Sequence, residues 1–296
     1  MRLSSSVMVA LFLFLMISAA GCGAIPQATQ SPTPIIPTET LAPSSTFTPT
    51  MVPSTASATI TPAPSWVFHP AGRVTCPILL YHHVLDIDPP TLYFISPAEF
   101  ETEMDLLHDW GYTTIPISLL VQAITHGAAL PPHPVVITFD DNNEDNYTNA
   151  FPIMRRLGFT GVLYIVSNRL GSKDYLNKAE ILQMVAAGWE VGNHSMSHPN
   201  LVNNPDLLWK EAVQSRLDLE AELGLPIDTF AYPFGAANES MMSKISKYGY
   251  EAAMGLGTSS IQGPFNLFYL NRIVLDSSID IKSFTAFLPW SGTIKK

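Results

Sequence analysis

The chain has 296 residues, of which 47% are hydrophobic and 14% are charged, and its formal net charge is −10 at pH 7. This length and apolar content suffice for a barrel-sized domain, whereas the acidic balance and the lack of a basic run argue against nucleic acid as a partner. The sequence also indicates no protein partner. Of its two cysteines, only Cys76 lies beyond the N-terminal region, so we expect no intrachain disulfide in the folded part.

Residues 1–22 have the features of an export signal. Arg2 precedes an apolar run from Val7 to Ile17, which is short for a membrane-spanning helix. Small residues directly before Cys22 resemble a bacterial lipoprotein signal, in which that cysteine becomes lipidated; the alternative is ordinary cleavage after Ala20. We therefore expect an exported protein, anchored by an N-terminal lipid to the outer face of a bacterial membrane, in the cell envelope or extracellular space.

Residues 23–66 are predicted to form a disordered stalk. From Pro26 to Ser65 the chain is dominated by Pro, Thr and Ser, lacks Gly and carries one charge, Glu39. Such a composition cannot form a packed core, and its prolines favour an extended, semi-rigid spacer. The folded domain is therefore expected to span residues 67–296.

In that region, short β-rich runs alternate with helical patterns. Ser96 and Gly111 supply start and stop signals for the first helix. Alternation on this scale predicts an α/β fold with parallel strands and helical crossovers, and the lack of a glycine-rich nucleotide loop favours a barrel over an open sheet. The predicted strands cover residues 77–84, 135–141, 161–167, 189–195 and 229–235, with β-rich segments near 251 and 270, and the predicted helices cover residues 97–110, 150–157, 178–187, 206–223 and 239–248.

Polar side chains recur where the predicted strands end. In a parallel α/β barrel the carboxyl ends of the strands converge on one face, where active sites lie. These groups could therefore meet. In chain order they are His82 and His83, Asp140 and Asp141, His194 and His198, and the turn from Tyr232 to Gly235.

The stretch HSMSH places His194 and His198 four residues apart, a spacing that a helical turn would bring to one side. Two imidazoles and one carboxylate form a half-open site for a divalent metal that leaves room for water. With two adjacent acids, one can bind the metal while the other takes a proton from the activated water. Taken singly, the histidine pair also fits surface or core histidines, and the pair of adjacent acids also fits a simple turn.

The stretches TFDD, HSMSH and AYPFG, in this order, resemble the three central motifs of the polysaccharide deacetylases, also called carbohydrate esterase family four or NodB-like domains. The leading PILLYHHV and the late LNRIVL further resemble the circularly permuted branch that deacetylates poly-N-acetylglucosamine. The resemblance covers roughly Cys76 to Leu275. It implies a distorted (β/α) barrel of about seven parallel strands, with residues 67–296 as the catalytic domain.

The resemblance also implies a metal site and a base. Asp140 would be the general base, and Asp141, His194 and His198 would hold a divalent metal, zinc before other ions. The implied reaction removes N-acetyl groups from an N-acetylglucosamine-containing polysaccharide by hydrolysis of a linear amide.

Further roles follow from the same resemblance. The turn of Tyr232, Pro233 and Phe234 would bind substrate and stabilise the oxyanion through a backbone NH, that of Phe234. His82 would protonate the leaving amine, and Arg272 would orient or tune the base. The alternatives are that the aromatic turn only closes the core and that Arg272 pairs with an acid elsewhere.

Asn142 and Asn143 stand where the family usually has Gly and an aromatic residue, so they could alter substrate entry. These residues motivate the first of two other functions that stay open. One is a catalytically impaired surface lipoprotein that binds glycans; the other is an O-acetyl ester deacetylase acting on a polysaccharide such as xylan. His83 is expected either to pack against its neighbours or to meet solvent.

Overall fold

The computed structural model describes residues 65–293. The predicted signal, the lipidation site Cys22 and almost all of the predicted stalk therefore lie outside the described residues. Among the helices that the structure describes, none is long and apolar enough to cross a membrane.

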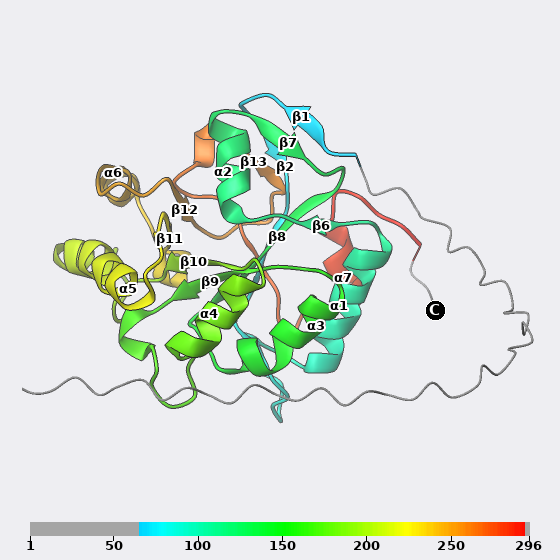
Figure 1. The fold of residues 1–296 in the computed structure, drawn as a ribbon, viewed down its shortest axis with the longest axis horizontal. Coiled ribbons are helices and arrows are strands. Elements are labelled where there is room, and N and C mark those ends of the chain that lie inside the picture. The colour runs from blue at the N-terminus through cyan, green and yellow to red at the C-terminus, as the bar shows by residue number, and fades with distance from the viewer. Residues whose placement is uncertain (1–64, 294–296) are drawn as a thin grey trace, which may run out of the picture. The chain divides into compact units, whose positions relative to one another are not determined.

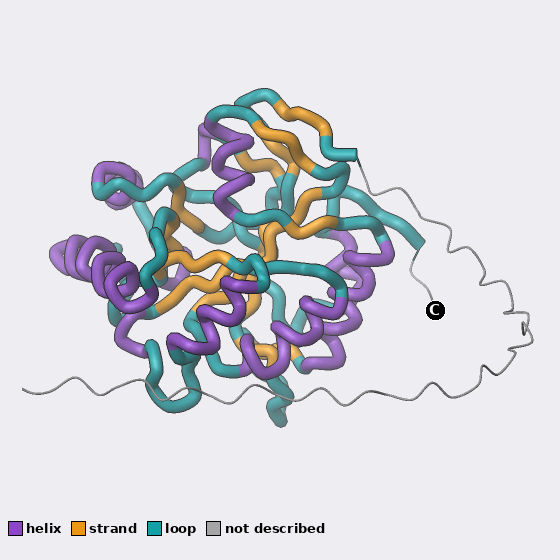
Figure 2. The backbone as a smooth tube through the Cα atoms, in the orientation of Figure 1, coloured by secondary structure: helices purple, strands orange, loops and turns teal. Residues whose placement is uncertain are grey.

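The centre of the domain is a curved parallel sheet, with its strands in the interior and its helices around the outside (Figures 1 and 2). This arrangement confirms the predicted distorted barrel of about seven parallel strands. A further short strand, β6 (Thr113–Thr114), adds to β8. The order across the sheet is β12 (Ala252–Met254), β11 (Thr229–Ala231), β10 (Glu190–Asn193), β9 (Val162–Ile165), β8 (Pro134–Asp140), β3 (Ile78–Tyr81) and β14 (Ile273–Val274).

One segment brings the two edges of this sheet together. The Leu270 NH donates to the Ala253 carbonyl at 2.8 Å, and the Gly255 NH donates to the Leu270 carbonyl at 2.9 Å. The same segment continues into β14, which pairs with β3 and forms the edge of the sheet opposite β12. Residues 270–274 therefore close the barrel. Only a few main-chain hydrogen bonds join this segment to β12.

The helices agree with the sequence patterns in most places. The predicted first helix is α1 (Pro97–Asp109), and Ser96 caps it through a capping box with Glu99. The others are α2 (Ile117–Thr125), α3 (Phe151–Arg156), α4 (Lys178–Ala186), α5 (Ser215–Leu223), α6 (Glu239–Lys247) and α7 (Ile281–Ala286).

Three helical features differ from the sequence prediction. The predicted helix over residues 206–223 begins with a 3-10 turn (Pro205–Leu207) and a π-helical segment (Lys210–Gln214) before α5. Helix α2 was not predicted, because its sequence ISLLVQAIT is apolar on most sides and rich in β-branched residues. Helix α7 was also not predicted, and its 6 residues are too few for a clear period.

Small strand pairs complete the domain. Antiparallel pairs join β1 (Val67–His69) to β7 (Ala128–Leu130) and β2 (Val74–Thr75) to β13 (Ile261–Gln262), while β4 (His83–Val84) runs parallel to β5 (Phe94–Ile95). Every residue of β3 and β8 is buried, as expected for strands covered on both faces. Acidic and imidazole side chains follow these buried runs at their carboxyl ends.

Candidate active site

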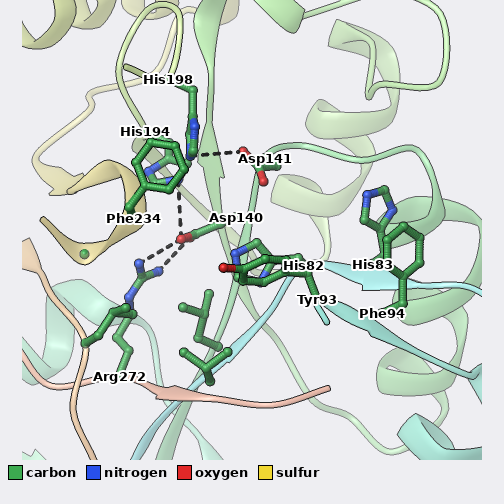
Figure 3. A pocket seen from close by; sticks show the side chains of 14 residues that line it. His82, His83, Tyr93, Phe94, Asp140, Asp141, His194, His198, Phe234 and Arg272 are labelled. Carbon is green, nitrogen blue, oxygen red and sulfur yellow. Dashed lines mark hydrogen bonds and ion pairs between the residues drawn. The ribbon is translucent and has the colours of Figure 1, made fainter. Parts of the chain in front are cut away.

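A pocket of about 280 Å³ lies at the carboxyl ends of the central strands. The acid pair lies at its base, with Phe234 on one side and His82 with Tyr93 on the other (Figure 3). The pocket therefore gathers residues that are far apart in the sequence. Its lining comprises Leu80, His82, His83, Tyr93, Phe94, Asp140, Asp141, His194, His198, Phe234, Gly235, Leu256, Arg272 and Val274.

The two adjacent carboxylates reach the pocket because the backbone changes conformation between them. Asp140 is the last residue of β8 and is only 2% exposed. Asp141 and Asn142 take left-handed backbone conformations, with φ of 74° and 50°. In a continuing strand the Asp141 side chain would point to the opposite face from Asp140. The left-handed turn instead lets both carboxylates line the same pocket.

Asp140 is held by a buried cation. Arg272 Nη1 and Nη2 donate to its two carboxylate oxygens at 2.6 and 2.8 Å, and His194 Nε2 lies 3.5 Å from Oδ2. Burial alone would raise the pKa of Asp140, but the charge of Arg272 and the hydrogen bonds that it donates outweigh that effect. The pKa of Asp140 is therefore held well below its usual range, and the carboxylate stays ionised.

Asp141, His194 and His198 each offer a ligand atom, and these three atoms lie within 4.8 Å of one another. His198 Nε2 is 3.6 Å from Asp141 Oδ1. Two ligand atoms on a tetrahedral zinc ion are about 3.4 Å apart, so this cluster matches a metal site after small adjustments.

The second ring nitrogen of His194 supports the same interpretation. His194 Nδ1 lies 2.9 Å from the carbonyl of Ala231, which can only accept a hydrogen bond, so Nδ1 carries the proton. In the neutral ring with this tautomer, Nε2 has its lone pair toward the cluster, which is the arrangement typical of metal-binding histidines. In His198, burial and the neighbouring His194 lower the pKa to about 4, although the nearby Asp141 raises it, so the ring is neutral at pH 7.

The two histidines do not lie on a helical turn, as their spacing suggested. They lie on a loop after β10, in which Ser195 and His198 have φ of 71° and 60°. The Ser195 hydroxyl accepts the His198 NH at 2.9 Å. Buried Glu211 accepts the NH groups of Met196 and Ser197 at 2.9 and 2.8 Å. This carboxylate was not predicted, and a lone Glu within an amphipathic helix gives no local signal of such a role.

His82 lies at the end of β3, and its ring packs against Tyr93 with centroids 4.7 Å apart. Burial lowers the pKa of His82, while the charges of Asp140 and Asp141 oppose that shift. His83 lies apart from the acid pair: its Nδ1 is 2.6 Å from Asp145 Oδ2. The structure thus places His82 beside the acids and leaves His83 in a packing role.

The turn from Tyr232 to Gly235 presents one backbone NH. The Tyr232 NH donates to the Met254 carbonyl, the Gly235 NH donates to the Tyr232 carbonyl, and Pro233 has no NH. Within this described turn the Phe234 amide alone is left for an outside acceptor. Phe234 itself has φ of 61°, the residue is 58% exposed, and the centroid of its ring lies 4.5 Å from that of His198.

The two asparagines after the acid pair point away from the pocket. Asn142 is fully buried, and its Oδ1 accepts the Val166 NH at 2.9 Å. Asn143 Nδ2 donates to the His82 carbonyl at 3.3 Å. Neither residue lines the pocket, so they do not narrow its entrance. Sequence reasoning also missed Arg169, whose Nη1 donates to Asp141 Oδ1 at 2.7 Å.

The chain is similar to known polysaccharide deacetylases. The polysaccharide deacetylase family model matches residues 127–253. The poly-β-1,6-N-acetyl-D-glucosamine N-deacetylase of Staphylococcus aureus (strain MRSA252) is 28% identical over 200 residues, which cover 62% of this chain and 68% of the relative.

Solved structures show the same fold. A polysaccharide deacetylase from Bacillus cereus is 26% identical with a TM-score of 0.64, covering 73% of this chain and 69% of that one. A Streptococcus pyogenes deacetylase in complex with acetate has a TM-score of 0.66 at 22% identity, covering 76% of this chain and 99% of that one. The predicted family resemblance is confirmed.

Proposed function

We propose that this chain, which belongs to the polysaccharide deacetylase family, is a metal-dependent hydrolase that removes N-acetyl groups from an N-acetylglucosamine-containing polysaccharide. The observation that carries the proposal is the meeting of Asp141, His194 and His198 at the base of one pocket, with ionised Asp140 beside them. The substrate follows from the Staphylococcus aureus relative, whose name specifies poly-β-1,6-N-acetyl-D-glucosamine.

The donor set fits a divalent metal, and we propose zinc. One carboxylate and two neutral imidazoles are the ligands of many catalytic zinc sites, and three protein ligands leave a position open. When bound, the ion would supply Lewis acidity toward the acetyl carbonyl and toward water. Asp141, His194 and His198 would hold it.

Asp140 acts as the base that takes a proton from the attacking water. Its pairing with Arg272 keeps it ionised, so it can accept a proton across the physiological range. The Phe234 NH donates a hydrogen bond to the oxyanion that forms from the acetyl carbonyl. A single oxyanion donor is typically worth about 3 to 4 kcal/mol of barrier, which makes the backbone of this turn as important as a side chain.

His82 supplies the proton that the leaving amine needs. An amine is a poor leaving group unless it is protonated, so hydrolysis of an N-acetyl group requires an acid near the scissile bond. His82 lines the pocket on the side opposite Phe234 (Figure 3). Its lowered pKa makes the protonated ring a stronger acid than an ordinary histidine.

Two other functions are weighed against this one. A glycan-binding protein without turnover was suggested by Asn142 and Asn143, but both side chains lie outside the pocket. An O-acetyl ester deacetylase would use the same base, metal and oxyanion donor without needing His82 as acid. A substrate panel that includes acetylated xylan distinguishes the ester from the amide activity.

The direct test measures acetate released from β-1,6-linked N-acetylglucosamine oligomers by the full chain. A chelator should abolish release, and added zinc should restore it. Asp140→Asn should lose at least about 100-fold in rate while keeping its metal, because it removes the base and no ligand. Asp141→Asn should lose metal affinity as well. Unchanged release by Asp140→Asn would refute the assignment of the base.

The location of the protein is a separate proposal. We propose that the chain is exported and held on the outer face of a bacterial membrane through a lipid on Cys22, where it would meet an envelope polysaccharide. Cys22→Ala should move the protein from the membrane fraction to the soluble fraction. Retention of this variant in the membrane fraction would contradict lipid anchoring.

A further inference from the structure

The segment that follows Asp140 and Asp141 contacts the main chain of His82, the residue proposed to protonate the leaving amine. Asn146 Nδ2 donates to the His82 carbonyl at 2.7 Å, and Asn143 Nδ2 donates to the same oxygen at 3.3 Å. Asn146 is fully buried and Asn143 is 3% exposed. One main-chain carbonyl therefore receives two buried amide donors, both from the segment that follows Asp141.

Asp145 holds His83 and Val84, the two residues that follow His82. Its Oδ1 accepts the Val84 NH at 2.8 Å, and its Oδ2 lies 2.6 Å from His83 Nδ1. Asn146 Nδ2 also donates to Asp145 Oδ1 at 3.2 Å, so the two side chains support each other. We call Asn143, Asp145 and Asn146 the polar clamp. It holds three successive residues, 82 to 84, where the chain leaves β3.

The side chain of His82 is not positioned by hydrogen bonds of its own. Its Nδ1 is buried and has no partner among the described residues, and its ring contacts Tyr93 by packing. The imidazole is therefore positioned by the main chain at residue 82, whose carbonyl accepts both amide donors, together with the packing of Tyr93. That main chain is held by the polar clamp, which begins two residues after Asp141.

We propose that Asn146, supported by Asn143, is a positioning residue that fixes His82 relative to the Asp140–Asp141 pair. This inference rests on the proposed function, because it takes His82 as the acid that protonates the leaving amine. The clamp asparagines do not line the pocket, so they act through His82 and not on the substrate. The arrangement makes the base, the metal ligand and the acid parts of one rigid unit.

The experiment compares two substrates that differ in their need for an acid. Acetate release from a β-1,6-linked N-acetylglucosamine oligomer requires protonation of the amine, whereas 4-nitrophenyl acetate releases a stable phenolate without it. The zinc-loaded full chain is compared with Asn146→Ala, His82→Ala and Asn149→Ala. Asn149 is the matched control, because its Nδ2 donates to the Val84 carbonyl at 2.8 Å in a bond of the same kind, two residues beyond His82.

We expect Asn146→Ala to turn over the oligomer about 100-fold more slowly and the aryl ester less than about threefold more slowly, as His82→Ala does. Asn149→Ala should stay within about threefold of the parent on both substrates. Metal content should be equal in all four proteins. Asn146→Asp, which places an acceptor against the His82 carbonyl, should behave like Asn146→Ala.

Equal losses of Asn146→Ala on both substrates, or no loss on either, would overturn the positioning role. If His82→Ala itself shows no preference between the substrates, the acid assignment in the proposed function fails instead. NMR of histidine-labelled protein adds a readout that needs no activity. The His82 ring signal, identified by its loss in His82→Ala, should shift in Asn146→Ala and stay in place in Asn149→Ala; an unshifted signal in Asn146→Ala would contradict the inference.

Discussion

Arg272 and Asp140 form a buried ion pair in which the two terminal guanidinium nitrogens each donate to one carboxylate oxygen, at 2.6 and 2.8 Å. The two side chains are 1% and 3% exposed and lie 132 residues apart in the sequence. A bidentate pair of this kind fixes the plane of the carboxylate as well as its charge. The base is therefore oriented from the segment that also closes the barrel.

Removing the cation should damage both stability and activity. Arg272→Met leaves a buried, uncompensated carboxylate, so the free energy of unfolding should fall by about 3 to 5 kcal/mol. The pKa of Asp140 should rise, which moves the acid limb of the kcat/KM profile to higher pH. Urea unfolding and a pH–rate profile measure both effects. The double variant Asp140→Asn with Arg272→Met should regain most of the lost stability, and a double variant no more stable than Arg272→Met would contradict the pairing argument.

The proposed oxyanion site gives the backbone NH of Phe234 a role in the chemical step and gives its side chain a role only in substrate binding. Phe234→Ala keeps the NH but removes a ring that contacts the ring of His198, in a residue that is 58% exposed. We expect KM to rise about tenfold, while the turnover rate changes less than about threefold. Phe234→Gly is the control, because glycine accepts the φ of 61° without strain. If turnover at saturating substrate slows at least about 100-fold in both variants, the ring acts in the chemical step, and the assignment of the ring to substrate binding is wrong.

The strand and helix patterns were sufficient to predict the fold class and the convergence of the strand-end clusters, whereas the role of each residue, including that of Arg272, came from the family resemblance. Buried β-branched runs ending in Asp or His predicted parallel strands with a common carboxyl edge, and the structure has that edge. The geometry of the HSMSH loop could not be predicted, since it depends on left-handed residues and on Glu211, which lies on a distant helical segment. Arg169 was missed for the same reason, because nothing near it in sequence indicates that it contacts Asp141.

The effect of Asn142 can be tested directly. If this residue hindered the substrate, Asn142→Gly would raise activity. Because its Oδ1 instead accepts the Val166 NH in the interior, the substitution should leave kcat/KM within about twofold and cost about 1 to 2 kcal/mol of stability. Acetate release and chemical unfolding provide the two measurements. A tenfold gain in activity would favour the interpretation of the native protein as an impaired enzyme.

Glu103 gives the domain a pH-dependent stability. It is 3% exposed on α1 and accepts a hydrogen bond from the Tyr81 hydroxyl at 2.7 Å. Burial raises its pKa from 4.5 to about 8, although the bond from Tyr81 opposes the shift. Between these two pH values the folded protein keeps the proton that the unfolded chain releases. The stability is therefore full below pH 4.5 and falls as the pH rises toward about 8.

The glutamine variant isolates this effect, because Glu103→Gln is neutral in both states at every pH. One pKa unit corresponds to about 1.4 kcal/mol, so the native protein should lose a few kcal/mol more than the variant between about pH 5 and about pH 8.5. Urea unfolding at both pH values measures the difference. Tyr81→Phe should extend the loss to higher pH, because the hydroxyl lowers the pKa of Glu103. Equal losses in the native protein and Glu103→Gln would show that Glu103 does not hold its proton in the folded domain.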